Sequence, residues 1–310
     1  MRVLITGSSG LIGTNLGLAL LARGDEVVGL DRRKNAWTDK LPTVTCNLCE
    51  LKPGALPVSQ KFDVVVHLAA YAKVFELVQH PDRALENVTM LFNVLDYCRQ
   101  HETPVIFGSS REVYGDIHQH VTDEASADFV VAESPYSASK IAGEAFIYSY
   151  AQCYKLPCLV FRFSNVYGRY DCDLDRMERV IPLFVKRIAD AQSIVVFGRE
   201  KVLDFTFVDD CVQGIVKGID ALTAGKIRRD TINLACGQGG TLVDVVNLIA
   251  LAVGREPQVR YEPARPGEIT RYVADIGKAR RLLGYEPTTP LTAGIPRAIR
   301  WQREAGFLKG

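Results

Sequence analysis

Near its amino terminus the chain reads Thr6-Gly7-Ser8-Ser9-Gly10-Leu11-Ile12-Gly13. This glycine-rich turn follows a short apolar run at residues 3–5, which is typical of a buried strand. An apolar stretch of helical length comes next, over residues 11–21, and Gly24 ends it. Strand, glycine turn and helix in this order form the first unit of a nucleotide-binding α/β fold, so the segment decides the fold class.

The spacing of the glycines indicates what the turn binds. Gly7 permits the tight turn, Gly10 lets the backbone approach a pyrophosphate, and Gly13 lets the helix pack closely on the strand. The first helical residues, Leu11 and Ile12, then offer N–H donors and a positive dipole end to the phosphates. These five residues are therefore predicted to hold a dinucleotide cofactor.

The second predicted strand indicates which dinucleotide binds. It covers residues 26–30 and ends in Asp31, about 20 residues after the turn, where a carboxylate can accept hydrogen bonds from both ribose hydroxyls. A carboxylate there would repel a 2′-phosphate, which favours NAD over NADP. Arg32 and Arg33 oppose that preference, because a guanidinium can bind such a phosphate. The position of Asp31 at the strand end favours NAD.

Further along the chain, the segment Tyr136-Ser137-Ala138-Ser139-Lys140 places a phenol and an ammonium on one face of a predicted helix. A lysine held beside a tyrosine favours the phenolate and lowers the pKa of the phenol. The tyrosine could then exchange a proton with a sugar or alcohol hydroxyl. Tyrosine and lysine at this spacing also occur by chance, so the pair gains its weight from the nucleotide-binding turn.

Composition argues against several functional classes. The chain has 310 residues and a formal net charge of +1 with both signs interspersed, which gives no electrostatic footprint for nucleic acid or an anionic membrane. No apolar run approaches the ~20 residues of a membrane span and no signal peptide is evident, so we expect a cytoplasmic protein. Eight cysteines include the pair Cys46 and Cys49, without a second such pair to complete a metal site. We expect neither a metal nor disulfides.

Strands and helices continue to alternate along the chain. The predicted strands and helices lie, in order, at residues 63–68, 82–100, 105–107, 135–154, 158–162 and 231–234. This alternation predicts an α/β fold with a Rossmann-type, doubly wound parallel sheet. We expect residues 1–164 to form the NAD-binding domain, with a returning strand near 231–235. Residues 165–310, richer in proline and glycine, are expected to form mostly a smaller lobe that binds the substrate.

Two strand ends carry small or polar side chains toward the predicted crevice. The residues that follow the strand at 63–68, and that would let a nicotinamide ribose lie across its end, are Leu68, Ala69 and Ala70. Ser110 follows the next strand, where its hydroxyl could hydrogen-bond the reacting oxygen and pass the proton to Tyr136. A lone serine after a strand is usually a turn or cap residue. Beside a tyrosine–lysine pair it becomes a catalytic candidate.

Together, these motifs resemble the extended short-chain dehydrogenase/reductases, and in particular the NAD-dependent nucleotide-sugar epimerase/dehydratase family. The spacing Gly-x-x-Gly-x-x-Gly, rather than Gly-x-Gly-x-x-Gly, is typical of that superfamily. The similar segments follow the family's order from end to end and lie at residues 6–13, 67–70, 109–115, 134–140, 162–168, 204–210 and 278–285.

The resemblance implies roles for individual residues. Tyr136 is expected to be the base, Lys140 to hold the nicotinamide ribose and tune Tyr136, and Ser110 to bind the sugar hydroxyl. Asn87 matches a contact to the cofactor, and Asn165 matches a contact to the nucleotide diphosphate. The family also dimerises commonly through two helices per subunit, here those near residues 82–100 and 135–154, so we expect a homodimer.

Two positions depart from the family pattern. Asn47 stands where an aspartate usually contacts adenine, but its amide oxygen can still accept from the adenine amine, and Asn47 and Leu48 are expected beside the cofactor. Leu203 stands where an arginine usually contacts the substrate diphosphate. The arginines that could supply the missing charge are Arg199, Arg260 and Arg265. Arg265, in Ala-Arg-Pro-Gly-Glu, fits a second phosphate-contact pattern and is preferred.

The chemistry implied by the resemblance is transient oxidation. Tyr136 removes the proton of the sugar 4-OH as hydride passes to NAD, which gives a 4-keto sugar. Hydride return to the other face gives 4-epimerisation, on a UDP-hexose or a UDP-uronic acid, and this is our first expectation. The alternatives are decarboxylation of UDP-glucuronate, 4,6-dehydration, net reduction of a keto-sugar, and a non-catalytic NAD sensor. The presence of Ser110, Tyr136 and Lys140 argues against the sensor.

The triplet Ser110-Arg111-Glu112 bears on that choice. The family's 4,6-dehydratases resemble Thr-Asp-Glu here, with the aspartate as general acid, and Arg111 cannot replace it because guanidinium stays protonated. Decarboxylases resemble Thr-Ser-Glu, so Glu112 keeps decarboxylation open. Arg111 could also clamp the carboxylate of a uronic acid. In the alternative that we favour, Arg111 and Glu112 satisfy each other or Arg111 points away.

Overall fold

A computed structural model describes residues 1–115, 124, 132–175 and 178–308. Its elements, in chain order, are β1 (Arg2–Thr6), α1 (Leu11–Arg23), β2 (Glu26–Asp31), β3 (Thr43–Thr45), β4 (Val64–His67), α2 (Val74–Gln79), α3 (Asp82–His101), β5 (Val105–Ser110), the 3₁₀ turn η1 (Arg111–Tyr114), α4 (Pro135–Tyr154), β6 (Cys158–Phe163), β7 (Asn165–Tyr167), α5 (Val180–Ala189), β8 (Ile194–Phe197), β9 (Val202–Phe207), α6 (Val208–Thr223), β10 (Arg229–Leu234), β11 (Gly239–Thr241), α7 (Leu242–Val253), β12 (Val259–Glu262), α8 (Gly277–Leu283) and α9 (Leu291–Glu304).

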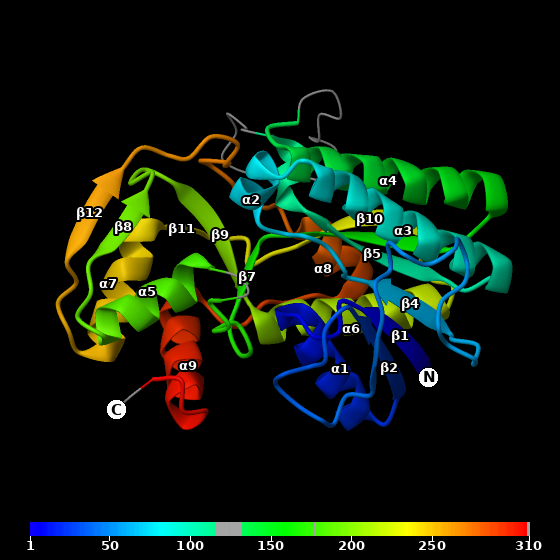
Figure 1. The fold of residues 1–310 in the computed structure, drawn as a ribbon, viewed down its shortest axis with the longest axis horizontal. Helices are drawn as coiled ribbons and strands as arrows, with labels where there is room; N and C mark the ends of the chain where they lie inside the picture. Colours follow the sequence, from blue (N-terminus) through cyan, green and yellow to red (C-terminus); the bar gives the residue numbers. More distant parts are fainter. Residues whose placement is uncertain (116–123, 125–131, 176–177, 309–310) are drawn as a thin grey trace.

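Seven parallel strands form the large sheet, in the order β10-β6-β5-β4-β1-β2-β3 (Figure 1). The strand order reverses at β1, which pairs with β2 on one side and with β4 on the other. Ile5 accordingly lies opposite Gly29 and Val66. Sheets of this kind bind ligands at the carboxyl ends of the strands beside such a reversal. The sheet confirms the predicted Rossmann-type fold.

Helices cover both faces of the large sheet (Figure 1). α3 and α4 pack against each other on one face, and Val94 and Ile147 belong to the core beneath them. α1, α6 and α8 cover the other face, with Leu16 and Ile215 in its core. Because both faces are covered, the central strand β4 is buried at every position.

A smaller lobe lies beside the large sheet (Figure 1). It contains the three-stranded sheet β11-β9-β7 and the two-stranded sheet β12-β8, with α5, α7 and α9. Phe184, Val245 and Ile295 belong to its core. α6, α8 and β10 also come after residue 164, yet they pack on the large sheet or join it. The sequence predicted that a strand near residues 231–235 joins the large sheet. It did not predict that the helices α6 and α8 pack on that sheet.

The predicted elements are confirmed with changes at their ends. The first helix continues to Arg23, and β5 continues to Ser110. Ser110 therefore belongs to the strand instead of following it. None of the helices in the described part of the chain combines the length and apolar composition needed to cross a membrane.

An aromatic cluster connects the two lobes on the side of α1. Trp37 lies in the loop after β2, and its ring centroid is 5.8 Å from that of Tyr170, 6.1 Å from that of Trp301 and 5.6 Å from that of Phe307. Trp301 belongs to α9. The loop that begins beside the predicted ribose-binding Asp31 is thereby attached to the last helix of the chain.

A buried ion pair ties α4 to the large sheet. Arg162 of β6 donates to Glu144 of α4 from Nε to Oε1, at 3.0 Å, and from Nη2 to Oε2, at 2.7 Å. Ser109 of β5 donates to the same Oε1 at 2.6 Å. The two charged side chains are 2% and 0% exposed. Their bidentate geometry offsets the desolvation that such burial costs.

Replacing Glu144 with alanine should strongly destabilise the fold, because it leaves the Arg162 guanidinium buried without its counter-charge. We expect the free energy of unfolding to fall by about 3–5 kcal/mol, measured by chemical denaturation. The matched control is Lys186→Ala, which removes an exposed pair with Asp190 and should cost at most about 1 kcal/mol. A similarly small loss in Glu144→Ala would contradict the prediction.

Candidate active site

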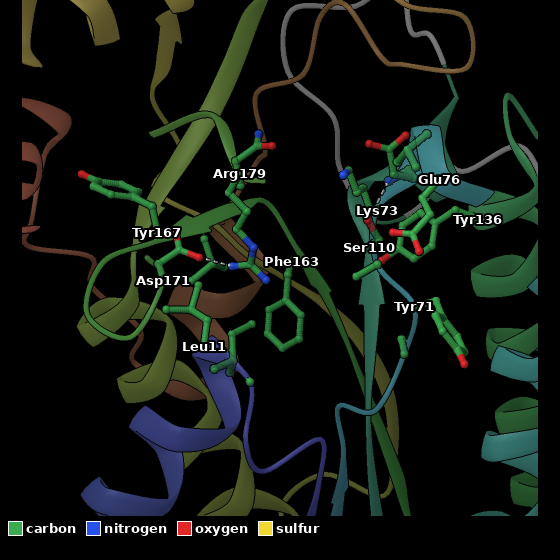
Figure 2. Close-up of a pocket in the computed structure, with 18 of the residues that line it drawn as sticks. Leu11, Tyr71, Lys73, Glu76, Ser110, Tyr136, Phe163, Tyr167, Asp171 and Arg179 are labelled. Carbon is green, nitrogen blue, oxygen red and sulfur yellow. Dashed lines mark hydrogen bonds and ion pairs between the residues drawn. The ribbon is translucent and has the colours of Figure 1, made fainter. Parts of the chain in front are cut away.

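One large cavity, of about 570 Å³, lies between the two lobes. The large sheet contributes the glycine turn and the ends of β4 and β5, and the smaller lobe contributes β7, the start of α5 and β9. Figure 2 shows side chains from both sides pointing into this cleft. The predicted site residues that line it are Gly7, Gly10, Leu11, Ile12, Gly13, Asp31, Asn47, Leu48, Leu68, Ala69, Ala70, Ser110, Arg111, Glu112, Tyr136, Lys140, Asn165 and Arg265.

The glycine turn has the geometry that a dinucleotide requires. Gly7 has a φ of +73°, and a Cβ atom there would lie 2.7 Å from the backbone nitrogen of Ala69. A Cβ atom on Gly13 would lie 2.2 Å from the carbonyl oxygen of Gly7. Gly10 caps α1 without a side-chain hydrogen bond, so the first N–H groups of the helix stay available to a phosphate. These features fit the pyrophosphate of NAD.

Asp31 is positioned by the backbone around it. Its Oδ2 accepts from the backbone N–H of Ser9 at 3.0 Å, and its Oδ1 accepts from that of Arg33 at 3.0 Å. Arg32 is engaged elsewhere, because its Nη1 donates to the hydroxyl of Tyr71 at 2.6 Å and its guanidinium lies over that ring. The carboxylate thus lies in the cleft with its orientation fixed, as a ribose-binding residue needs.

The other predicted cofactor contacts differ in their surroundings. Asn47 uses its own amide within a turn, donating to Glu50 at 2.8 Å and accepting from the N–H of Cys49 at 3.1 Å. Asn87 does not line the cleft. Its amide accepts from the N–H of Tyr71 at 2.8 Å and donates to the carbonyl oxygen of Tyr71 at 3.0 Å. Asn87 therefore holds the segment after β4 in place, and a direct contact with NAD stays a prediction.

The three predicted catalytic residues meet at the carboxyl end of β5. Ser110 ends that strand, and its side chain lies beside the phenol of Tyr136, which belongs to the first turn of α4. One turn later, the ammonium of Lys140 donates to the carbonyl oxygen of Gly108 at 2.7 Å. Its Nζ lies 5.7 Å from the centroid of the Tyr136 ring. A sugar hydroxyl at this strand end could reach both the serine and the tyrosine.

The expected lowering of the tyrosine pKa by Lys140 does not occur in this structure. Burial raises the pKa of Tyr136 to about 12, and the Glu112 carboxylate also raises it. The nearby Ser110 hydroxyl and the charges of Arg111 and Arg179 lower the pKa of Tyr136 by less. Burial also lowers the pKa of Lys140 to about 8. Tyr136 and Lys140 lie one helical turn apart on α4, as predicted. The desolvation of the phenol nevertheless outweighs the effect of the nearby charges on its pKa.

Arg111 and Glu112 pair with each other, as in the alternative that the sequence favoured. Nη2 of Arg111 lies 3.0 Å from Oε1 of Glu112 and donates to Oδ1 of Asn165 at 3.3 Å. Both charged side chains are nearly buried in the wall of the cleft beside Ser110. Burial raises the pKa of Glu112, and Arg111 opposes that shift. The guanidinium charge is therefore compensated before any ligand binds.

The arginines proposed to replace the charge missing at Leu203 have different positions. Arg265 lines the cleft, with its guanidinium 3.9 Å from the ring centroid of Phe197. Arg199 lies over the ring of Tyr261 and does not line the cleft. Arg260 pairs with Glu262 at the exposed β12 strand. Of these three arginines Arg265 alone lines the cleft, and its contact with the diphosphate stays a prediction.

Sequence reasoning missed several ion pairs in the cleft, among them that of Lys73 with Glu178, whose charged atoms lie 3.9 Å apart, and two closer pairs. Lys201 contacts Glu268 at 2.5 Å, and Arg179 contacts Asp171 at 3.0 Å. No motif or spacing signals either pair, because each joins positions that only the folded loops bring together. Among the described residues, no three His, Cys, Asp or Glu side chains are grouped so that they could hold a metal ion.

Replacing Asp31 with asparagine should weaken the preference for NAD over NADP. The change removes the charge that repels a 2′-phosphate while keeping the shape of the side chain. We expect the Kd for NAD to rise by about tenfold and the Kd for NADP to fall, in calorimetric titrations of protein stripped of cofactor. Lys34→Ala, at an exposed position of the same loop, is the control. An unchanged ratio of the two affinities in Asp31→Asn would show that Asp31 does not select the cofactor.

Comparison with known proteins places this site in context. A model of the NAD dependent epimerase/dehydratase family matches residues 3–235. The UDP-glucose 4-epimerase of Mycolicibacterium smegmatis is 30% identical, over 98% of this chain and 99% of that protein. The UDP-glucose 4-epimerase of Thermus thermophilus, solved with NAD, is 28% identical with a TM-score of 0.85, over 98% and 100% of the two chains.

A third similar protein acts on a charged sugar. The UDP-glucuronic acid 4-epimerase of Bacillus cereus, solved with UDP-glucuronic acid and NAD, is 25% identical with a TM-score of 0.88, over 98% of this chain and 100% of that one. The family model covers well over half of the chain. The chain therefore belongs to the NAD dependent epimerase/dehydratase family.

Proposed function

We propose that this protein is a UDP-sugar 4-epimerase that acts through a transient 4-keto sugar. One observation carries the proposal: Ser110, Tyr136 and Lys140 meet at the end of β5, in the same cleft as the glycine turn and Asp31. Similar proteins over the full length are epimerases of UDP-glucose and of UDP-glucuronic acid. The arrangement supports proton transfer at a sugar hydroxyl held against a dinucleotide.

The residues of the large sheet would hold the cofactor and the reacting sugar. The glycine turn binds the pyrophosphate of NAD, Asp31 the adenosine ribose, and Lys140 the nicotinamide ribose. When bound, NAD would accept a hydride from C4 of the sugar and return it to the same carbon. Ser110 orients the 4-OH, and Tyr136, as the phenolate, would take its proton and later return it. Because burial raises the pKa of Tyr136, ionisation of the phenol needs nearby positive charge, which Lys140 and the nicotinamide ring of bound NAD would supply. Epimerisation follows when the keto-sugar presents its other face before reduction.

The pair of Arg111 and Glu112 favours a neutral hexose over a uronic acid. A sugar carboxylate brought to Arg111 would also meet the carboxylate of Glu112, and like charges in a buried site repel. A hydroxyl avoids this conflict, because it can donate to the glutamate and accept from the arginine. We therefore take a UDP-hexose as the first substrate to test and a UDP-uronic acid as the second.

Decarboxylation of UDP-glucuronate is the second candidate function. The observation that favours it is the position of Glu112, which lines the cleft beside Ser110 and has a pKa raised by burial. A 4-keto uronate is a β-keto acid and can lose carbon dioxide once formed. Dehydration is less favoured, because it needs a general acid at the position of Arg111. A guanidinium does not give up its proton and cannot fill that role.

We further propose that the protein forms a homodimer through α3 and α4. Large apolar side chains are exposed on these helices: Leu85 is 70% exposed and Phe92 37% on α3, and Tyr154 is 54% exposed on α4. Phe92 also packs edge-on against Phe146 of α4, with ring centroids 6.3 Å apart. A second copy could cover this face and remove it from water.

Purified protein incubated with UDP-galactose should give UDP-glucose, an isomer of unchanged mass, without added NAD if the cofactor stays bound. Tyr136→Phe should lower kcat by about 10²–10⁴-fold, because it removes the group that moves the proton. Products are separated by chromatography and weighed by mass spectrometry.

The control for this experiment is Tyr261→Phe, at an exposed position of β12 in the smaller lobe, which should retain full activity. UDP-glucuronate is tested in parallel. Loss of carbon dioxide from UDP-glucuronate would establish the decarboxylase instead. Formation of a reduced product with consumption of free NADH would establish a reductase. Full activity in Tyr136→Phe would exclude the proposed role of the tyrosine.

Leu85→Glu should convert the dimer into a monomer, because it places a charge in the proposed apolar contact between copies. The mass in solution is measured by light scattering coupled to size-exclusion chromatography. Leu251→Glu is the control, since Leu251 is 81% exposed on α7, in the smaller lobe. A monomeric wild-type protein, or a Leu85→Glu variant that stays dimeric, would refute the proposed interface.

A further inference from the structure

The loop between β7 and α5 brings Asp171 and Arg179 together inside the cleft (Figure 2). Nη1 of Arg179 lies 3.0 Å from Oδ1 of Asp171. The arginine side chain is 32% exposed and the aspartate side chain only 5%. The guanidinium therefore faces the cleft while the carboxylate lies behind it, and Oδ2 of the carboxylate is buried with no hydrogen-bond partner among the described residues.

This orientation differs from that of two other close ion pairs in the cleft. In Lys201 and Glu268 the lysine is 6% exposed and the glutamate 26%, so the carboxylate faces the cleft. In Arg111 and Glu112 both side chains are nearly buried, at 11% and 5%. Of these three pairs, only the one formed by Arg179 presents its positive member to a ligand.

The position of Arg179 suits an anionic group at the boundary between the two halves of the cleft. Leu11, at the phosphate-binding start of α1, lines the same cleft, and Figure 2 shows it in the region of the ion pair. Leu203, from β9 on the other side, lines the cleft as well and supplies no charge. A guanidinium binds phosphate oxygens through parallel N–H donors, so a diphosphate fits this position better than a neutral group.

We propose that Arg179 binds a diphosphate group in the cleft and that Asp171, which orients Arg179, takes up a proton when the diphosphate binds. The diphosphate could belong to NAD or to the sugar nucleotide, and the two share the chemistry that Arg179 recognises. The claim for the sugar nucleotide rests on the proposed function. Asp171 is a positioning residue, because its carboxylate reaches the ligand only through the arginine.

The surroundings of Asp171 explain why a proton would follow the ligand. Burial raises the pKa of Asp171 to about 7, and Arg179 is the charged group that lowers it. The Cys172 thiol is its titratable neighbour in the loop, with a pKa raised by burial and by Asp171. The residues that α1, β6 and β7 present in this part of the cleft are Leu11, Phe163 and Tyr167, of which only the tyrosine titrates, with a pKa raised by burial.

The sign of the pH dependence follows from these charges. A bound diphosphate brings negative charge toward Asp171 and shares the arginine that stabilises the carboxylate, so it raises the pKa of Asp171 further. The protonated form then binds the ligand more tightly. Affinity should be highest below the pKa of the free protein, about 7, and should fall as the pH rises through that value.

Calorimetric titration of UDP into the NAD-loaded protein tests the proton uptake. Titrations at about pH 7.5 in two buffers with different ionisation enthalpies give the number of protons bound with the ligand. UDP itself contributes to that number, so the difference between the wild type and Asp171→Asn is decisive. We expect the wild type to take up more protons than Asp171→Asn, whose affinity should also depend less on pH. Equal uptake in both proteins would overturn the role of Asp171.

The source of the diphosphate is identified with Arg179→Met. If the sugar nucleotide is the ligand, this variant keeps its NAD through dialysis and binds UDP about tenfold more weakly or worse. If NAD is the ligand, the variant loses NAD through dialysis, and re-saturated protein binds UDP normally. Unchanged NAD retention together with unchanged UDP affinity would overturn the proposal.

Two further variants separate binding from folding. Arg179→Lys keeps the charge without the planar donors and should recover part of the lost affinity. Lys186→Met, on α5 and outside the cleft, should behave as the wild type. Melting temperatures of all variants show whether breaking the pair only weakens the fold. The epimerase assay is independent: absence of any isomer product refutes the proposed function and leaves the diphosphate site standing.

Discussion

The candidate active site depends on one face of α4 that lies against β5 at three successive turns. Tyr136, Lys140 and Glu144 are spaced four residues apart, so they lie on the same face. Each lies against the strand: the phenol is beside Ser110, the ammonium donates to the carbonyl oxygen of Gly108, and the glutamate accepts from the strand and from the buried arginine of β6. The buried ion pair at one end thus fixes the tyrosine two turns away, and a shift of the helix along the strand would break all three contacts together.

Much of this arrangement follows from local chemistry that a sequence displays. Gly7 and Asp31 were identifiable because a tight turn and a strand end need those residue types at that spacing, and the long apolar strands show themselves by composition. β7 and β11 escaped prediction because three residues are too few for a periodic pattern. The pair of Asp171 and Arg179 escaped because its partners come from one irregular loop. The raised pKa of Tyr136 escaped because spacing reveals a neighbouring charge but not the burial that opposes it.

Three of the cations that line the cleft are compensated before any ligand enters. Arg111, Arg179 and Lys201 each have a carboxylate partner, so the free protein does not hold several like charges close together in a poorly solvated space. An anionic ligand that approaches these three cations therefore does not simply meet a positive surface. It competes with carboxylates that already occupy the cations, and the gain in binding is the difference between two sets of ion pairs. Such a site can discriminate between anions by how closely their oxygen atoms take the positions of the displaced carboxylate oxygens.

The aromatic cluster between the lobes has a consequence for how the molecule can be observed. Trp37 and Trp301 are both of the tryptophans that the chain contains, and they face each other across the lobe boundary. The intrinsic emission of the protein therefore arises almost wholly at one contact, between the loop after the Asp31 carboxylate and the last helix. Any separation of the lobes would expose both indole rings to water at the same time. Tryptophan fluorescence of the unlabelled protein should therefore report any change in the distance between the two lobes.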